Sequence, residues 1–335
     1  MSRLSTIFTF ALAISFPFSA YAADSARVRF GIMTPQEDTT WEDLLATWKE
    51  AEALGYDGAW GYDHFIPIIG KEGGPTLEGW TLLAALARET KTIRIGLLVT
   101  GNTYRNPAVL AKMATTVDHL SGGRLNLGIG AAWAEHEHRA YGIPFHTARE
   151  RAERLGEALE VITLLWKRDR ATFDGKYYDL RDAPLEPKPV QKPHPPIVVG
   201  GKGKKWILPT VAKYADEWNV PIGLEPEEMK EGIEIIRKEC ERIGRSPCVR
   251  EVSVLLPLIS ITNVPLAGPV TRLGARVIVE KRIAKSLLAG SAKDIEKRLR
   301  EFVDAGATSV ILSLRPPYDR ELMRRFAREV MPAFR

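Results

Sequence analysis

An acidic residue stands directly before a histidine at Asp63-His64. Histidine is the side chain that titrates nearest to neutral pH, so such a pair can hold a proton or donate to a developing anion. Spacing alone leaves a second interpretation equally open, in which Asp63 anchors a loop and His64 lies at the surface, because adjacent side chains on an extended backbone point apart. Asp63 and His64 are the candidate catalytic residues.

A second candidate segment is rich in glycine, at Gly200-Gly201-Lys202-Gly203-Lys204, and it stands before a predicted helix. Glycines let backbone amides approach an anion, and the start of a helix attracts negative charge. The spacing matches neither the dinucleotide-binding fingerprint nor the P-loop. We therefore predict a phosphate cradle here, with a flexible surface turn as the alternative.

The run Glu135-His136-Glu137-His138 has the residue types of a metal site. On a helix, however, only side chains three or four positions apart share a face. We interpret the run as the solvated start of a helix, and we predict no metal site.

Short apolar runs alternate with amphipathic stretches along the chain, and this alternation is typical of a parallel sheet covered by helices. The eight predicted strands cover residues 28–33, 58–62, 93–100, 125–131, 197–200, 217–220, 252–261 and 308–314. The predicted helices cover residues 41–54, 77–89, 108–120, 149–166, 206–214, 227–242, 292–305 and 320–330. Eight such units predict an α/β fold of the (β/α)8 TIM-barrel type, with residues 23–335 as a single domain.

Two stretches exceed a minimal barrel, residues 134–196 after the fourth strand and 262–290 after the seventh. Residues 171–180 predict a hairpin with an Asp-Gly turn. Because reacting groups in a barrel come from the carboxyl ends of the strands, we expect both insertions over the catalytic face.

The N-terminus predicts export. Arg3 precedes an apolar run over residues 4–18, and Ala20-Tyr21-Ala22 fits the small-x-small pattern of a cleavage site. We interpret residues 1–22 as a signal peptide that directs the protein to the periplasm or the medium. The alternative is an upstream start, with a cytoplasmic protein that begins near Val28. The run is too short for a stable membrane span.

The composition is that of an ordinary globular protein: 335 residues, 45% hydrophobic and 27% charged, with a formal net charge of +5. The positive charges are interleaved with acidic residues and form no block with aromatic residues, so we predict no nucleic-acid partner. Cys240 and Cys248 show no metal-binding spacing. We predict two unpaired thiols, with a disulfide as the alternative in an exported protein.

Several segments occur together in the order typical of one enzyme family. They are Tyr62-Asp63-His64-Phe65, Thr100-Gly101-Asn102-Thr103-Tyr104-Arg105-Asn106-Pro107, Asp118-His119-Leu120-Ser121-Gly122-Gly123-Arg124-Leu125, Gly128-Ile129-Gly130-Ala131-Ala132-Trp133, Glu137-His138-Arg139-Ala140-Tyr141-Gly142-Ile143-Pro144-Phe145, Glu186-Pro187-Lys188-Pro189-Val190-Gln191 and Pro195-Pro196-Ile197-Val198-Val199-Gly200-Gly201. In these segments the chain resembles the luciferase-like monooxygenase superfamily, within it the branch that depends on the deazaflavin coenzyme F-420.

The resemblance implies a (β/α)8 barrel that holds a flavin-type ring in its mouth, and a homodimer. It implies that His64, with Asp63, lies close to the reacting ring. It also implies cofactor-binding roles for a set of residues on the strand ends and loops: Thr100, Gly101 and Asn102 behind the ring, Gly130, Ala132 and Trp133 in the fourth-strand wall, Tyr141 beyond that wall, and Gly200 and Gly201 at the phosphate.

The chain departs from the family pattern at three positions. Tyr62 stands where relatives commonly have serine, Ala134 where many have asparagine, and Ala131 where some sugar-phosphate-oxidising members have glutamate. The last departure removes one proton donor. His64, Glu135 and Tyr141 remain as candidates for the acid and base.

The function that the resemblance implies is hydride transfer between reduced coenzyme F-420 and a small organic substrate. The first alternative is a two-component monooxygenase that uses FMN from a separate reductase. An exported solute-binding protein is an alternative of another class, although such proteins usually have two lobes. A barrel that has lost catalysis is a further alternative, suggested by Ala131 and Ala134.

Overall fold

Eight parallel strands form a closed barrel in the computed structural model, which describes residues 27–71, 73–262 and 286–335. Around the barrel they are β1 (Arg29–Met33), β2 (Gly58–Gly61), β3 (Arg94–Leu97), β5 (Leu125–Gly130), β8 (Ile197–Gly200), β9 (Glu217–Val220), β10 (Glu251–Ile261) and β12 (Ser309–Ser313). The last strand, β12, pairs with β1 over five residues and closes the sheet. The predicted (β/α)8 barrel is confirmed, and it has one body where a solute-binding protein would have two lobes.

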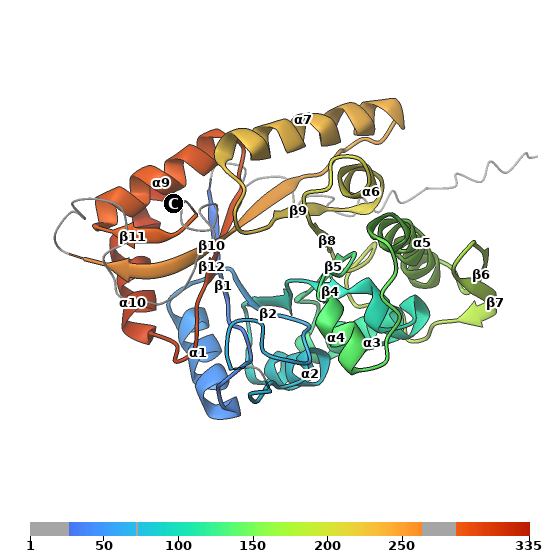
Figure 1. Ribbon diagram of the computed structural model, residues 1–335, viewed down its shortest axis with the longest axis horizontal. Coiled ribbons are helices and arrows are strands. Elements are labelled where there is room, and N and C mark those ends of the chain that lie inside the picture. Colours follow the sequence, from blue (N-terminus) through green and yellow to red (C-terminus); the bar gives the residue numbers. More distant parts are fainter. Residues whose placement is uncertain (1–26, 72, 263–285) are drawn as a thin grey trace, which may run out of the picture.

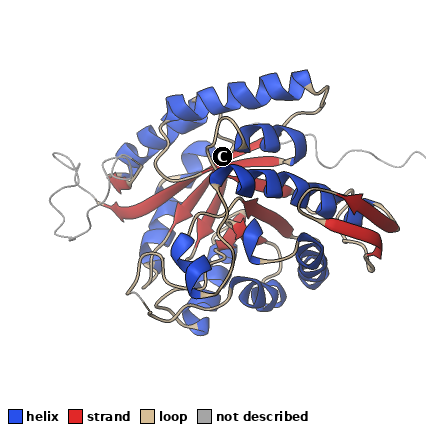
Figure 2. Cartoon of the chain, turned by 45° about the vertical axis from the view of Figure 1, so that its right-hand side comes forward, coloured by secondary structure: helices blue, strands red, loops and turns tan. Residues whose placement is uncertain are grey.

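Helices surround the barrel on its outer side (Figures 1 and 2). They are α1 (Trp41–Ala53), α2 (Gly79–Glu89), α3 (Pro107–Ser121), α5 (Ala148–Lys167), α6 (Ile207–Tyr214), α7 (Pro226–Arg242), α9 (Ala292–Asp304) and α10 (Arg320–Glu329). Each presents apolar side chains to the sheet, and Trp48 of α1, Phe302 of α9 and Phe326 of α10 are fully buried. Because this burial removes large apolar surfaces from water, it stabilises both layers.

The third strand is interrupted. We predicted one strand over residues 93–100, but β3 ends at Leu97, the Leu98–Val99 peptide is cis, and β4 (Thr100–Gly101) pairs separately with β5. The neighbouring strand allows this path because a Cβ atom on Gly128 would lie 1.9 Å from the carbonyl oxygen of Leu97. Only glycine at position 128 leaves room for the chain to turn inward there.

The insertion after β5 holds a short helix, α4 (Glu135–Ala140), and the hairpin β6 (Arg170–Asp174) and β7 (Asp179–Pro184). The hairpin is confirmed, although residues 175–178 form its loop. The insertion was expected over the catalytic face, and this is correct for α4, whose Glu137 binds His64, but wrong for the hairpin. The hairpin follows α5 and packs along it at the edge of the molecule (Figure 1), where Glu157 accepts hydrogen bonds from the backbone amides of Lys176 and Tyr177.

The insertion after β10 is described only at its ends, since residues 263–285 lie outside the described residues. The strand β11 (Leu288–Gly290) pairs in parallel with the end of β10. The predicted signal peptide, residues 1–22, also lies outside the described part. Among the helices that are described, none combines the length and the apolar character needed to cross a bilayer.

The two cysteines are paired, so the prediction of free thiols is wrong for the structure. Cys240 in the last turn of α7 forms a disulfide with Cys248, and their Cα atoms are 5.7 Å apart. Gly244, with a φ of 67°, turns the chain back directly after the helix. This turn brings two positions that are eight residues apart in sequence within the reach of a disulfide.

Candidate functional site

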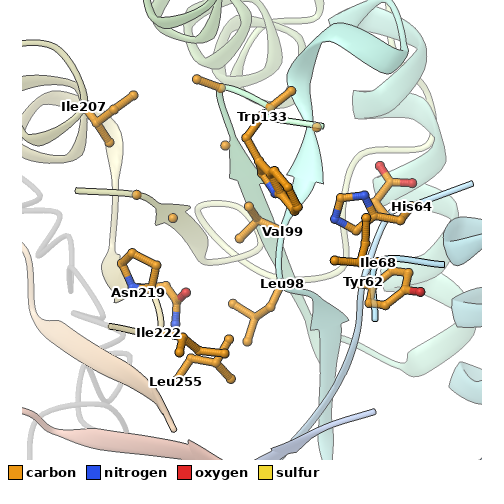
Figure 3. A pocket seen from close by; sticks show the side chains of 18 of the residues that line it. Tyr62, His64, Ile68, Leu98, Val99, Trp133, Ile207, Asn219, Ile222 and Leu255 are labelled. Carbon is orange, nitrogen blue, oxygen red and sulfur yellow. The ribbon is translucent and has the colours of Figure 1, made fainter. Parts of the chain in front are cut away.

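A cavity of about 560 Å³ opens at the carboxyl ends of the barrel strands. Its walls come from the segments after most of the strands, and Figure 3 shows labelled side chains from opposite sides of the barrel directed into it. Apolar groups predominate on these walls. The site therefore lies where a barrel places its reacting groups, and its size suits a small-molecule ligand.

His64 lines this cavity and is held from behind by a carboxylate. Its Nδ1 atom lies 2.8 Å from Oε2 of Glu137, a residue of α4. The ring also makes edge contacts with Tyr62 and Trp133, with ring centres 4.9 and 5.5 Å away. Tyr62, where relatives commonly have serine, thus becomes one of the supports of His64.

Glu137 is fully buried and accepts four hydrogen bonds. Besides His64, the donors are the backbone amides of Phe65 (2.6 Å) and Ile66 (2.9 Å) and the hydroxyl of Tyr104 (2.6 Å). Burial alone would raise the pKa of Glu137, but the hydrogen bonds and the nearby imidazole outweigh it and lower the pKa to about 2. At neutral pH Glu137 is therefore a carboxylate.

This carboxylate fixes the orientation and the tautomer of His64. Because it can only accept, Nδ1 of His64 must carry a hydrogen, and a neutral ring then has its lone pair on Nε2. No described residue forms a hydrogen bond with Nε2. His64 thus has one nitrogen bound to the protein and the other available to a ligand, which is the arrangement of a proton carrier.

Asp63 is a loop anchor. Its carboxylate is fully buried and forms a bidentate ion pair with Arg105, at 2.5 and 2.9 Å. Burial raises the pKa of the Asp63 carboxyl, and the Arg105 guanidinium opposes that shift. Arg105 also binds Glu78, 2.8 Å away, whose side chain caps the start of α2. Asp63 therefore ties three segments together behind His64, and the anchor interpretation applies to Asp63 but not to its neighbour.

The expected solvated start of α4 is wrong for half of its residues. Glu135 and His136 are exposed, but Glu137 and His138 are fully buried. Nδ1 of His138 donates to the carbonyl oxygen of Ala134 (2.8 Å), so its Nε2 accepts from the hydroxyl of Thr103, 2.6 Å away. In the part of the chain that is described, no cluster of His, Cys, Asp and Glu side chains could hold a metal ion.

The predicted residues at the end of the third strand do not all reach the cavity. Gly101 lines it. Thr100 is buried behind the wall, where its hydroxyl accepts from the indole of Trp80 at 3.0 Å. Asn102 is buried too, and its amide group lies 3.2 Å from the hydroxyl of Tyr178 in the hairpin loop. These two residues shape the wall without facing a ligand.

The fourth-strand segment forms one side of the mouth. Gly130, Ala131, Ala132 and Trp133 all line the cavity, and the indole of Trp133 is 61% exposed beside His64. Tyr141 does not line the cavity. It is 58% exposed and its ring contacts that of Phe65 at a tilt of 36°, with ring centres 4.9 Å apart.

The glycine-rich loop after β8 lies at the opposite side, and Gly200, Gly201 and Gly203 line the cavity. The amide of Gly201 donates to the carbonyl oxygen of Asn219, and the amides of residues 206–208 all donate to Gly203. Among the described residues, no partner binds the amides of residues 202–205. These four amides, with Lys202 and Lys205, are the donors of this loop that remain for an anion, because Lys204 forms an ion pair with Glu231 at 2.6 Å.

Sequence reasoning missed Glu137, Arg105 and Arg151 as site residues. Arg151, on α5, is the one arginine or lysine among the described residues that line the cavity. Its guanidinium donates to the carbonyl oxygen of Ala132 (3.3 Å) and lies 4.0 Å from the ring centre of Phe145. All three lie in or near the segments that carry the family resemblance, but their roles in the site become visible only from their contacts in the folded structure.

Comparisons with known proteins agree with the barrel fold. The family model described as luciferase-like monooxygenase matches residues 24–263. An F-420-dependent glucose-6-phosphate dehydrogenase from Amycolatopsis mediterranei is 29% identical over 324 residues, which cover 88% of this chain and 94% of the relative.

Two solved structures share the fold. An F-420-dependent secondary alcohol dehydrogenase, in complex with an F-420–acetone adduct, superposes with a TM-score of 0.79 at 23% identity, over 92% of this chain and 99% of that one. The oxygenating constituent of 3,6-diketocamphane monooxygenase from Pseudomonas putida, in complex with FMN, superposes with a TM-score of 0.71 at 17% identity, over 92% and 99%.

Proposed function

The chain belongs to the luciferase-like monooxygenase family, and from this premise we propose that it is a coenzyme F-420-dependent oxidoreductase that transfers hydride to or from a small organic substrate. The observation that carries the proposal is the His64–Glu137 pair, which presents one ring nitrogen to an apolar cavity at the mouth of the barrel. The full-length relatives named as F-420-dependent dehydrogenases support the choice of cofactor.

The residues present fit such a cofactor. A largely apolar cavity of about 560 Å³ can take a flat ring system, and the glycine loop with residues 202–205 can take a phosphate. Lys205 lies over the ring of Trp206 beside this loop and adds positive charge for an anionic tail. Arg149 lies over the same ring and forms an ion pair with Glu153.

The protein would position the reactants and handle one proton. Bound coenzyme F-420 supplies a ring carbon that accepts or donates hydride. The segment Gly130–Trp133 and the glycine loop would hold the ring, and Trp133 would cover His64 on its solvent side. His64 would take a proton at Nε2 when an alcohol is oxidised and return it when a carbonyl is reduced. The Glu137 carboxylate stabilises the protonated ring in that step.

Reoxidation of reduced coenzyme F-420 in the presence of a panel of ketones and aldehydes tests this function. We expect substrate-dependent oxidation of the cofactor by the wild-type protein, and a fall of roughly a hundredfold or more in His64→Ala. Turnover that is unchanged in His64→Ala would show that the site is assigned wrongly. A protein that turns over no substrate would revive the interpretation of a barrel that has lost catalysis.

FMN is the alternative cofactor, with a separate reductase as a partner. The FMN-containing structural neighbour supports it at the level of the fold, and so does Ala131, which lines the cavity where some sugar-phosphate-oxidising relatives have glutamate. Under this alternative, activity requires oxygen and reduced FMN.

We further propose a homodimer, which the family resemblance supports and light scattering in solution can measure.

We also propose that the protein is exported. The signal-like pattern of residues 1–22 supports this, and so does the Cys240–Cys248 disulfide, since disulfides persist mainly in oxidising compartments. Determining the N-terminal residue of protein from the native host tests the proposal. A mature chain that begins at Ala23 agrees with it, and an intact Met1, or a start near Val28, contradicts it.

A further inference from the structure

The floor of the cavity is a separate apolar cluster inside the barrel mouth. Met33, Leu98, Leu255 and Ile311 form it with Trp60 and Val198, and Val99 and Ile222 pack against it. Figure 3 shows Leu98, Ile222 and Leu255 on the same side of the cavity, across from His64 and Trp133. The side of the cavity opposite His64 therefore offers a substrate hydrocarbon surfaces.

The ionisable groups on the walls are already engaged. Asp63 is neutralised by Arg105, and Glu137 lies behind His64. Arg151 is bound to the carbonyl oxygens of Ala132 and His146, and it stands on the side of the cavity where the fourth-strand wall meets α5. No lysine is among the described residues that line the cavity.

A phosphorylated substrate would be poorly bound at such a floor. A phosphate group that leaves water needs cationic side chains or several hydrogen-bond donors, because an unpaired buried charge is very costly. The floor supplies the carboxamide of Asn219, which donates to the hydroxyl of Ser253 at 2.9 Å, and the hydroxyl of Ser313, and neither group carries a positive charge. An uncharged apolar substrate, in contrast, gains free energy from every contact with Met33, Leu98 and Leu255.

We infer that the substrate is a small, uncharged, largely apolar alcohol or its carbonyl counterpart, and not a sugar phosphate. The substrate must be small, because the same cavity has to hold the cofactor ring as well. This inference rests on the proposed function and adds the substrate class to it.

His64 and bound coenzyme F-420 together account for the proton and the hydride of the reaction. In the direction of alcohol oxidation, the carbinol C–H bond breaks and its electron pair leaves as hydride to oxidised coenzyme F-420. The hydroxyl proton moves to Nε2 of His64, and the carbon–oxygen double bond forms. Ketone reduction is the reverse, with hydride from the reduced cofactor and the proton from His64.

Calorimetry on protein loaded with oxidised coenzyme F-420 tests the inference without turnover. The two probes are cyclohexanone and glucose 6-phosphate. We expect cyclohexanone to bind at least about tenfold more tightly than the sugar phosphate. Glucose 6-phosphate that binds more tightly, or cyclohexanone that does not bind, would overturn the inference.

The variant Leu255→Ala should weaken cyclohexanone binding about fivefold to tenfold, because it removes apolar contacts at the floor. Ile222→Ala is a second variant in case the first does not fold, and a thermal melt checks both. Val190→Ala is the matched control, since Val190 is exposed and lies outside the cavity lining. Equal losses in the control and the floor variants would contradict the inference.

Failure of the inference can be told from failure of the proposed function. If coenzyme F-420 binds and is reduced by glucose 6-phosphate but not by cyclohexanol, only the substrate class is wrong. If coenzyme F-420 does not bind, the proposed function is wrong. Quenching of tryptophan fluorescence by cyclohexanone in cofactor-free protein then still reports whether the cavity takes an apolar ligand.

Discussion

At the scale of single residues, the site depends on one buried carboxylate. Glu137 binds the imidazole of His64, two backbone amides and a tyrosine hydroxyl, so one charge orders both this imidazole and the loop after β2. Asp63, one residue before His64, orders the same loop from the other side through Arg105. In the pair Asp63-His64, Asp63 is therefore an anchor and His64 is the proposed proton carrier, and each has its own partner.

Glu137→Gln tests the role of this charge. The amide can still accept from Nδ1 of His64, but it no longer stabilises the protonated ring, so we expect hydride transfer to fall about tenfold to a hundredfold with little change in cofactor affinity. Nitrogen NMR of the His64 ring should show a mixture of tautomers in the variant. Glu135 lies on the same helix but is exposed and paired with Arg139. Glu135→Gln should therefore leave the rate of hydride transfer and the tautomer of the His64 ring unchanged. Equal effects of the two variants would mean that Glu137 has no specific role.

Arg105→Leu tests the anchor. It leaves the fully buried Asp63 carboxylate without its cation, which should lower the free energy of unfolding by about 3 to 5 kcal/mol. Arg139→Leu is the control, because its 78% exposed side chain forms only a surface pair that contributes about 0.5 kcal/mol or less. Chemical denaturation measures both. A loss in Arg105→Leu as small as that in the control would contradict the anchor.

At the scale of elements, the two ends of the barrel differ in structure and in the kind of residue they carry. The carboxyl ends of the strands form the cavity, while the opposite end is closed by a charged cluster. Arg29 of β1 forms an ion pair with Glu251 of β10, and Glu217 of β9 lies buried beside them. Burial and the neighbouring charge of Glu251 raise the pKa of Glu217 to about 7.

This cluster predicts a pH dependence of stability. Between about pH 4.5 and 7 the folded protein binds a proton at Glu217 that the unfolded chain releases, so the free energy of unfolding should fall as pH rises through this window. The fall attributable to Glu217 is about 3 kcal/mol at most. Denaturation of wild type and Glu217→Gln at pH 5, 6 and 7 measures it. A slope that is the same in both proteins would refute the assignment.

Elements with a continuous apolar pattern could be predicted from the sequence, and elements that depend on distant contacts could not. The apolar runs of β5, which is fully buried, and of β8, which is buried up to Val199, are readily predicted as strands in an alternating α/β chain. The short helix α4 was recognised, but the burial of Glu137 depends on Tyr104 and the loop after β2, which lie more than thirty residues away. The inward turn at Leu98 likewise depends on the missing side chain of Gly128 in the next strand.

At the scale of the whole molecule, the chain is one closed barrel with its cavity at one end and a disulfide on its outer layer. The bond between Cys240 and Cys248 ties the end of α7 to the segment that leads into β10. It lies away from the residues that line the cavity. Its contribution should therefore be to stability, and not to catalysis.

The double variant Cys240→Ser/Cys248→Ser tests this separation. Loss of a disulfide that closes so short a loop should cost roughly 2 to 3 kcal/mol of unfolding free energy, because the unfolded chain gains freedom. The affinity for coenzyme F-420 should not change. Denaturation of wild-type protein with and without a reductant provides the control. A variant that unfolds at the same denaturant concentration as the oxidised wild type would contradict the expectation.

The most direct measurement is a parallel titration of the purified protein with coenzyme F-420 and with FMN, followed by absorbance and tryptophan fluorescence. We expect saturable binding of coenzyme F-420 and at least about tenfold weaker binding of FMN, since the free amides of residues 202–205 and the cations around Trp206 suit a longer anionic tail. Tight binding of FMN without binding of coenzyme F-420 would contradict the proposed function and favour the two-component monooxygenase.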